Sequence, residues 1–161
     1  MTTTAQRQST WPTSLAIGVA LGWFAVLSLA MWLGSNAPRP IAAWLVAYPM
    51  FALFPGVAGL AVSRAKSPGL VTALSTAVPM AALWLVLQSS TVQETPFGTR
   101  DDRLKYGIYA VVIGLGLLVA IRTGARLMRS GHTLLGFLAA GLIFVGVAAL
   151  ASYLLLFVTA Y

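Results

Sequence analysis

Three arginines at the end of an apolar stretch have the spacing that most clearly suggests a binding role. Arg122, Arg126 and Arg129 follow intervals of four and three residues, so they share one face if a helix continues through them. Gly131 is suited to ending such a helix. Guanidinium groups clustered beside a membrane segment can bind anionic lipid head groups or an acidic patch of a partner. Ordinary anchoring by positive charge on the cytoplasmic side is the simpler alternative.

His132 is the single histidine of the chain. Two histidine ligands to a haem therefore cannot come from one copy, although one histidine could bind a pigment or haem beside another subunit. The chain has no cysteine, which excludes disulfides, thiolate metal sites and cysteine catalysis. We predict no metal and no cofactor.

Catalytic motifs are missing from the sequence. It contains no P-loop, no H-E-x-x-H and no G-x-S-x-G. No acidic or basic residue lies inside any of the long apolar runs, so there is no acidic proton relay and no lysine for a Schiff base. We predict that the chain is not an enzyme.

Composition places the chain in a membrane. Of its 161 residues 59% are hydrophobic and only 8% are charged, whereas an average soluble domain carries about 25% charged residues. The net charge of +7 comes from basic residues scattered between apolar runs, without aromatic interleaving. This pattern favours contact with membrane lipids, anionic ones included, over binding of nucleic acid.

Five apolar runs approach the length of about 20 residues that a helix needs to cross the hydrocarbon. We predict an all-α integral membrane protein, a single transmembrane domain (1–161) of about five helices with short loops. The fourth run is the shortest, and we expect flanking polar residues to lengthen its helix. The first run is too long for a typical signal peptide and is kept as a mature helix. The runs are residues 12–33, 41–62, 69–87, 106–121 and 133–158.

Basic residues in the loops predict the orientation. With five spans, the N-terminus shares one side with the second and fourth loops, and that side is the richer in basic residues. We therefore predict a cytoplasmic N-terminus and an external C-terminus, in a plasma membrane that the arginine-, alanine- and glycine-rich composition suggests is prokaryotic. The first side carries Arg7, Arg64, Lys66, Arg122, Arg126 and Arg129, and the second carries Arg39, Arg100, Arg103 and Lys105.

Three prolines interrupt the second and third runs: Pro49, Pro55 and Pro79. Each removes a backbone donor and is expected to kink its helix. The hydroxyls of three residues before Pro79 could compensate for the lost bond. Such broken helices line substrate paths in transporters, whereas a purely structural kink is the simpler alternative. The three hydroxyl residues are Thr72, Ser75 and Thr76.

Small residues at four-residue spacing predict close helix contacts, within the bundle or between subunits. They are Gly18 and Gly22 on the first predicted helix, Gly116, Ala120 and Gly124 on the fourth, and Gly136 and Ala140 on the fifth.

The longest loop covers residues 88–105. Thr95, Pro96, Phe97 and Gly98 are typical of a turn. The following segment, from Thr99 to Asp102, resembles a capping box, so we expect the fourth helix to begin near Arg100. An external docking surface and a simple capped helix start are the two interpretations of this loop.

Two functional hypotheses follow. The lack of intramembrane charge, of ligand sets and of a domain outside the membrane favours an accessory or scaffold subunit of a larger membrane complex. Its partners would be other membrane subunits or further copies of itself. The alternative is a small homo-oligomeric transporter or channel for a neutral or apolar solute, with the prolines beside its path.

Overall fold

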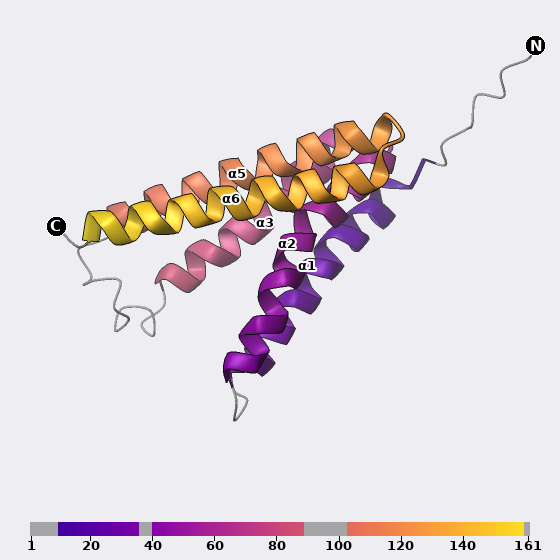
Figure 1. The fold of residues 1–161 in the computed structure, drawn as a ribbon. Coiled ribbons are helices and arrows are strands. Elements are labelled where there is room, and N and C mark those ends of the chain that lie inside the picture. Colours follow the sequence, from indigo (N-terminus) through magenta and orange to yellow (C-terminus); the bar gives the residue numbers. More distant parts are fainter. Residues whose placement is uncertain (1–9, 36–39, 89–102, 160–161) are drawn as a thin grey trace, which may run out of the picture.

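The computed structural model describes residues 10–35, 40–88 and 103–159, and this part of the chain forms five helices and no strand (Figure 1). The prediction of an all-helical fold is confirmed. The fourth apolar run indeed lies within a longer helix of 27 residues. The residues of the 88–105 loop from 89 to 102, with its turn and its capping box, lie outside the described part. The helices are α1 (Thr13–Ser35), α2 (Pro40–Arg64), α3 (Pro68–Gln88), α5 (Arg103–Arg129) and α6 (Thr133–Thr159).

Four of these helices are long and apolar enough to cross a membrane: α1, α3, α5 and α6. In α2 the apolar stretch found among the described residues is shorter, Phe51–Arg64. At 1.5 Å per residue the 21 residues of α3 extend about 31 Å, close to the hydrocarbon thickness of about 30 Å. The 27 residues of α5 extend about 40 Å, so this helix is long enough to project beyond the hydrocarbon.

The helices form two antiparallel pairs that approach each other at one end (Figure 1). One pair is α1 with α2, and the other is α5 with α6. The pairs diverge away from the end that carries the start of α1, the α2–α3 connection and the α5–α6 connection. We call this the common end. The start of α1 and the second and fourth loops therefore lie at the same end of the bundle. A chain of five helices that alternate in direction has this arrangement.

The central helices are α2 and α5. Helix α2 packs against the other four helices, and α5 packs against α2, α3 and α6. In α5 half of the candidate membrane-spanning segment is buried, whereas 17% of the corresponding segment is buried in each of α1, α3 and α6. The remaining helices therefore present most of their apolar surface outward, as helices surrounded by lipid do.

The core is built largely from small side chains. Five alanines lie in its central cluster with almost no exposure, and Phe24 of α1 packs on Phe54 of α2 with ring centroids 5.7 Å apart. Small side chains allow helix backbones to come close, which increases van der Waals contact where no hydrophobic driving force acts between helices. The five alanines are Ala16, Ala20, Ala58, Ala61 and Ala125.

Helices α5 and α6 touch through glycines near the common end. A Cβ atom placed on Gly124 would lie 3.0 Å from the carbonyl oxygen of Gly136, and one placed on Gly136 would lie 2.8 Å from the carbonyl oxygen of Gly124. Ala120 and Ala140 are fully buried in the same helices, and Gly116 lies against Val147. These predicted small-residue positions do form close helix contacts.

The other predicted pair does not pack within the bundle. A Cβ atom on Gly18 or Gly22 would meet nothing within 4 Å, so neither glycine supports a close approach between helices of this chain. Gly59 of α2, which the sequence analysis did not single out, does: a Cβ atom there would lie 3.3 Å from both the carbonyl oxygen of Ile121 and the amide nitrogen of Ala125. Gly18 and Gly22 therefore do not mark a contact inside the bundle, and the alternative of a contact between subunits stays a prediction.

Hydrogen bonds complete the common end. The N–H of Trp11 donates to the carbonyl of Arg64 at 2.7 Å, and the N–H of Lys66 donates to the carbonyl of Trp11 at 3.2 Å. The guanidinium of Arg64 also lies over the Trp11 ring, 5.4 Å from its centroid, a cation–π contact. The segment before α1 is thereby attached to the α2–α3 connection.

Helix α5 ends in a Schellman motif. The N–H of His132 donates to the carbonyl of Leu127 at 3.0 Å, and the N–H of Gly131 donates to the carbonyl of Met128 at 3.1 Å. Gly131 has a φ of 91°, which L-amino acids with a side chain rarely adopt. The prediction that Gly131 ends this helix is confirmed.

Substituting Gly124 or Gly136 tests the α5–α6 contact. We expect Gly124→Ala and Gly136→Ala each to lower the free energy of unfolding by about 1–3 kcal/mol, because the new methyl group meets a backbone carbonyl that cannot move aside. Gly146→Ala in α6 is the matched control, since its Cβ meets nothing within 4 Å, and it should not destabilise. Unfolding by titration with a denaturing detergent measures all three, and equal effects would contradict the contact.

The end of α5 is tested at Gly131. Gly131→Ala should cost about 1 kcal/mol of stability because alanine resists positive φ, whereas Gly131→Asn should retain most of it because asparagine visits this region more readily. Thermal denaturation in mild detergent compares the two variants. If alanine and asparagine proved equivalent, the backbone conformation would not be what limits this position.

Candidate functional site

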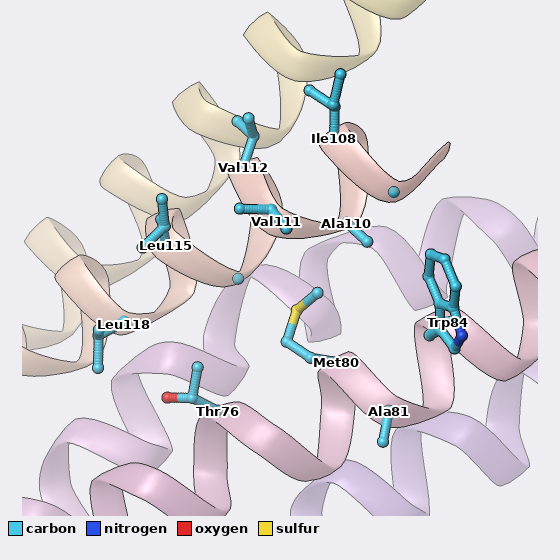
Figure 2. A pocket seen from close by; sticks show the side chains of 12 residues that line it. Thr76, Met80, Ala81, Trp84, Ile108, Ala110, Val111, Val112, Leu115 and Leu118 are labelled. Carbon is cyan, nitrogen blue, oxygen red and sulfur yellow. The ribbon is translucent and has the colours of Figure 1, made fainter. Parts of the chain in front are cut away.

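Two features of the described residues could bind something: an apolar groove between α3 and α5, and a basic pocket at the common end. The groove has a volume of about 880 Å³ and lies along the outside of the two helices (Figure 2). The residues of α3 that line it are Thr76, Met80, Ala81 and Trp84, and those of α5 are Gly107, Ile108, Ala110, Val111, Val112, Gly114, Leu115 and Leu118.

The groove exists because large side chains hold α3 away from α5. Met80 extends from α3 towards α5 (Figure 2), and its sulfur would lie 3.1 Å from a Cβ atom on Gly114. The Trp84 ring covers Gly107 at one end of the groove, with Cζ3 at 3.6 Å from such an atom. Thr76 lies towards the opposite end. Two long side chains thus make bridging contacts, and recesses remain beside them.

The groove offers almost no polarity. Its one hydroxyl, on Thr76, donates to the carbonyl of Thr72 at 2.9 Å and is turned to its own helix. The side chains on its rim are apolar and exposed: Ile108, Val111 and Leu115 each expose more than half of their surface. A ligand here would be held mainly by shape and dispersion.

Four of the eight α5 residues that line the groove lie on one stripe of the helix. Ile108, Val111, Leu115 and Leu118 succeed one another at intervals of three, four and three residues. This is the spacing of a seam against which another helix packs at a small crossing angle. Gly107 and Gly114, one heptad apart, are where Trp84 and Met80 of α3 reach the surface of α5.

The basic pocket brings together the three arginines that the sequence analysis placed on one face. It measures about 270 Å³, and all three side chains are exposed. The side facing them is the start of α3, which the arginine spacing alone did not reveal. The pocket is lined by Arg122, Arg126 and Arg129 of α5, by Pro68, Gly69 and Thr72 of α3, and by Val62 of α2.

No negative charge balances this pocket within the described residues. The three acidic residues of the chain, Glu94, Asp101 and Asp102, all lie outside that part. Arg64 and Lys66 add further positive charge at the common end. The Thr72 hydroxyl donates to the carbonyl of Pro68 at 2.8 Å, so the guanidinium groups supply the charge of the pocket.

The predicted prolines lie inside helices α2 and α3, but the nearby hydroxyls do not bind the carbonyl that Pro79 leaves without a donor. Pro55 in α2 and Pro79 in α3 are buried, whereas the side chain of Pro49 lies outside the described part. Pro79 cannot donate to the carbonyl of Ser75, four residues earlier. The hydroxyls of Thr72 and Thr76 bind the carbonyls of Pro68 and Thr72 instead, and the buried Ser75 hydroxyl has no partner in the structure. The expectation that these hydroxyls replace the lost bond is therefore wrong.

His132 is exposed between α5 and α6. Its Nδ1 lies 3.3 Å from the hydroxyl of Ser130, and its carbonyl accepts the first bond of α6 from the N–H of Gly136 at 2.9 Å. Among the described residues no group of three or more histidine, aspartate or glutamate side chains is arranged to hold a metal ion. His132 is thus part of the helix connection.

Comparisons with known proteins assign the chain to no family. No protein-family model, no curated protein and no solved structure matches it.

Proposed function

We propose that this chain is a non-catalytic accessory or scaffold subunit of a larger membrane complex, and that the α3–α5 groove receives a transmembrane helix of a partner subunit. The groove is the observation that carries the proposal. It lies on two helices long and apolar enough to cross a membrane, so its occupant would meet it from within the bilayer.

The regular lining supports a helix as the occupant over a lipid chain. An acyl chain needs only apolar surface, which every outward face of the bundle provides. The intervals of three, four and three between Ile108, Val111, Leu115 and Leu118 match the repeat of a second helix. The partner helix would pack on the exposed side chains of Ile108, Val111 and Leu115 and on Ala81 of α3.

The proposal includes an orientation. The common end carries Arg64, Lys66 and the three arginines of the basic pocket, so we place it on the cytoplasmic side of a prokaryotic plasma membrane. If α2 spans the membrane in addition to α1, α3, α5 and α6, the chain crosses it five times. The N-terminus is then cytoplasmic and the C-terminus external. The groove would lie within the hydrocarbon.

A groove-filling substitution tests the docking surface. Ala81 is exposed in the groove and Ala149 is exposed on α6 away from it, so Ala81→Trp and Ala149→Trp add the same bulk at a lining and a non-lining position. From native membranes in mild detergent, we expect Ala81→Trp to reduce a stoichiometric co-purifying membrane protein by about tenfold or more, and Ala149→Trp to leave it unchanged. Both variants should keep the thermal stability of the parent.

A photo-crosslinking residue identifies the occupant. Placed at Ala81 it should form an adduct with a transmembrane segment of that same protein, and placed at Ala149 it should not. A stable, monodisperse monomer without any partner, or equal co-purification with both tryptophan variants, would contradict the proposal. An adduct between two copies of this chain would instead assign the groove to self-association.

A second candidate is a small homo-oligomeric transporter or channel for a neutral or apolar solute. The favouring observation is Pro79, buried inside α3, together with the buried and unpaired hydroxyl of Ser75 one turn earlier. A polar atom without a partner and a missing backbone bond are features of interrupted helices beside a solute path.

Flux in proteoliposomes tests this second candidate. We expect uptake of a neutral solute by the parent chain, reduced severalfold in Pro79→Ala, where the backbone bond to Ser75 is restored. Absence of uptake by parent and variant alike would eliminate it.

A further inference from the structure

We propose that the basic pocket at the common end binds a phosphate group, as carried by the head group of an anionic phospholipid. The proposal is independent of the docking groove, which lies elsewhere on α3 and α5.

The charge of the pocket is unbalanced. Arg122, Arg126 and Arg129 line one small pocket, and none of them forms an ion pair or hydrogen bond with another described residue. Like charges that converge without a counterion repel one another, so a pocket of this kind is relieved by an anion. Guanidinium groups match phosphate oxygens through paired N–H donors.

The start of helix α3 faces the arginines across the pocket. Helix α3 begins at Pro68, and its first turn closes with the N–H of Val71 on the carbonyl of Ser67 at 3.3 Å. The N–H of Gly69 comes before that bond and has no partner within the helix. The positive end of the α3 dipole thus adds to the field of the three arginines in the same pocket.

The position of the pocket along α3 suits a lipid head group. Helix α3 is about as long as the hydrocarbon is thick, so when this helix spans a bilayer its first residues reach the level of the head groups. Arg122 and Arg129 are separated by about 10 Å along the axis of α5, so the arginines extend across the layer where lipid phosphates lie. At about 270 Å³ the pocket is smaller than sites for drug-sized ligands (about 300–1,000 Å³) and suits a single compact group.

Substitutions at Gly69 separate anion binding from stability. A Cβ atom there meets nothing within 4 Å, so a side chain fits. Gly69→Asp places a carboxylate in the pocket, where it occupies the positive field and also stabilises the start of α3. Gly69→Asn has the same shape without the charge. Arg126→Gln removes one guanidinium, and Lys66→Gln removes the same charge from the common end outside the pocket.

The experiment adds phosphatidylglycerol, or phosphatidylcholine as a zwitterionic comparison, to the delipidated full chain in mild detergent and counts bound lipid by native mass spectrometry. We expect phosphatidylglycerol to bind in preference to phosphatidylcholine. Its affinity should fall about tenfold in Arg126→Gln and in Gly69→Asp, the latter without loss of thermal stability, and should be nearly unchanged in Gly69→Asn and Lys66→Gln.

A parallel arm titrates inorganic phosphate and follows thermal stabilisation. If phosphate alone stabilises the parent chain and competes with the lipid, the pocket takes soluble phosphate compounds; if it does neither, the lipid is the source. Both outcomes support a phosphate site provided that Gly69→Asp abolishes the effect. The proposal is overturned if phosphatidylglycerol binds Gly69→Asp as it binds the parent, or if Lys66→Gln weakens binding as much as Arg126→Gln.

Discussion

The structure depends on how closely α5 can approach its neighbours. Near the common end backbone atoms come close together, because Gly124 and Gly136 face each other and Gly59 of α2 lies against the backbone of α5. Further along, long side chains such as Met80 and Trp84 separate α3 from α5. The size of the residue that each neighbouring helix places against α5 therefore distinguishes the tight contacts with α2 and α6 from the groove beside α3.

The two ends of the α3–α5 contact differ in polarity. The common end is compact and basic, with the start of α3 directed at the arginines of α5. The groove between the same two helices is almost wholly apolar. Helices α3 and α5 thus form a basic pocket at the common end and an apolar groove along their length. Helix α5 contributes to both and also packs against α2 and α6.

The sequence predicts where the helices of this protein lie better than it predicts which helices contact one another. Apolar length located all five, and the residue type of Gly131 identified how α5 ends, because both are properties of a local segment. Four-residue spacing selected Gly124 and Gly136, which pack, and equally Gly18 and Gly22, which do not. Spacing defines a face of a helix, but whether another helix lies on that face is decided by contacts distant in sequence.

The same limit applies to the candidate site. The arginines could be placed on one face of α5 from their intervals, whereas the start of α3 opposite them could not, since it depends on how α2 returns the chain to the common end. The heptad order of Ile108, Val111 and Leu115 was readable in principle. It was not singled out because an apolar face in a membrane helix is indistinguishable from ordinary lipid-facing surface until a neighbouring helix defines a recess.

The backbone pairing of Trp11 has a consequence for how the molecule is made. Its amide and carbonyl bind residues of the α2–α3 connection, Arg64 and Lys66, which are synthesised more than fifty positions later. The beginning of α1 therefore cannot reach its final place while only the first hairpin has left the ribosome. The start of α1 is thus fixed only after α2 and the connection that follows it have been made, which makes the first two helices a single unit of folding.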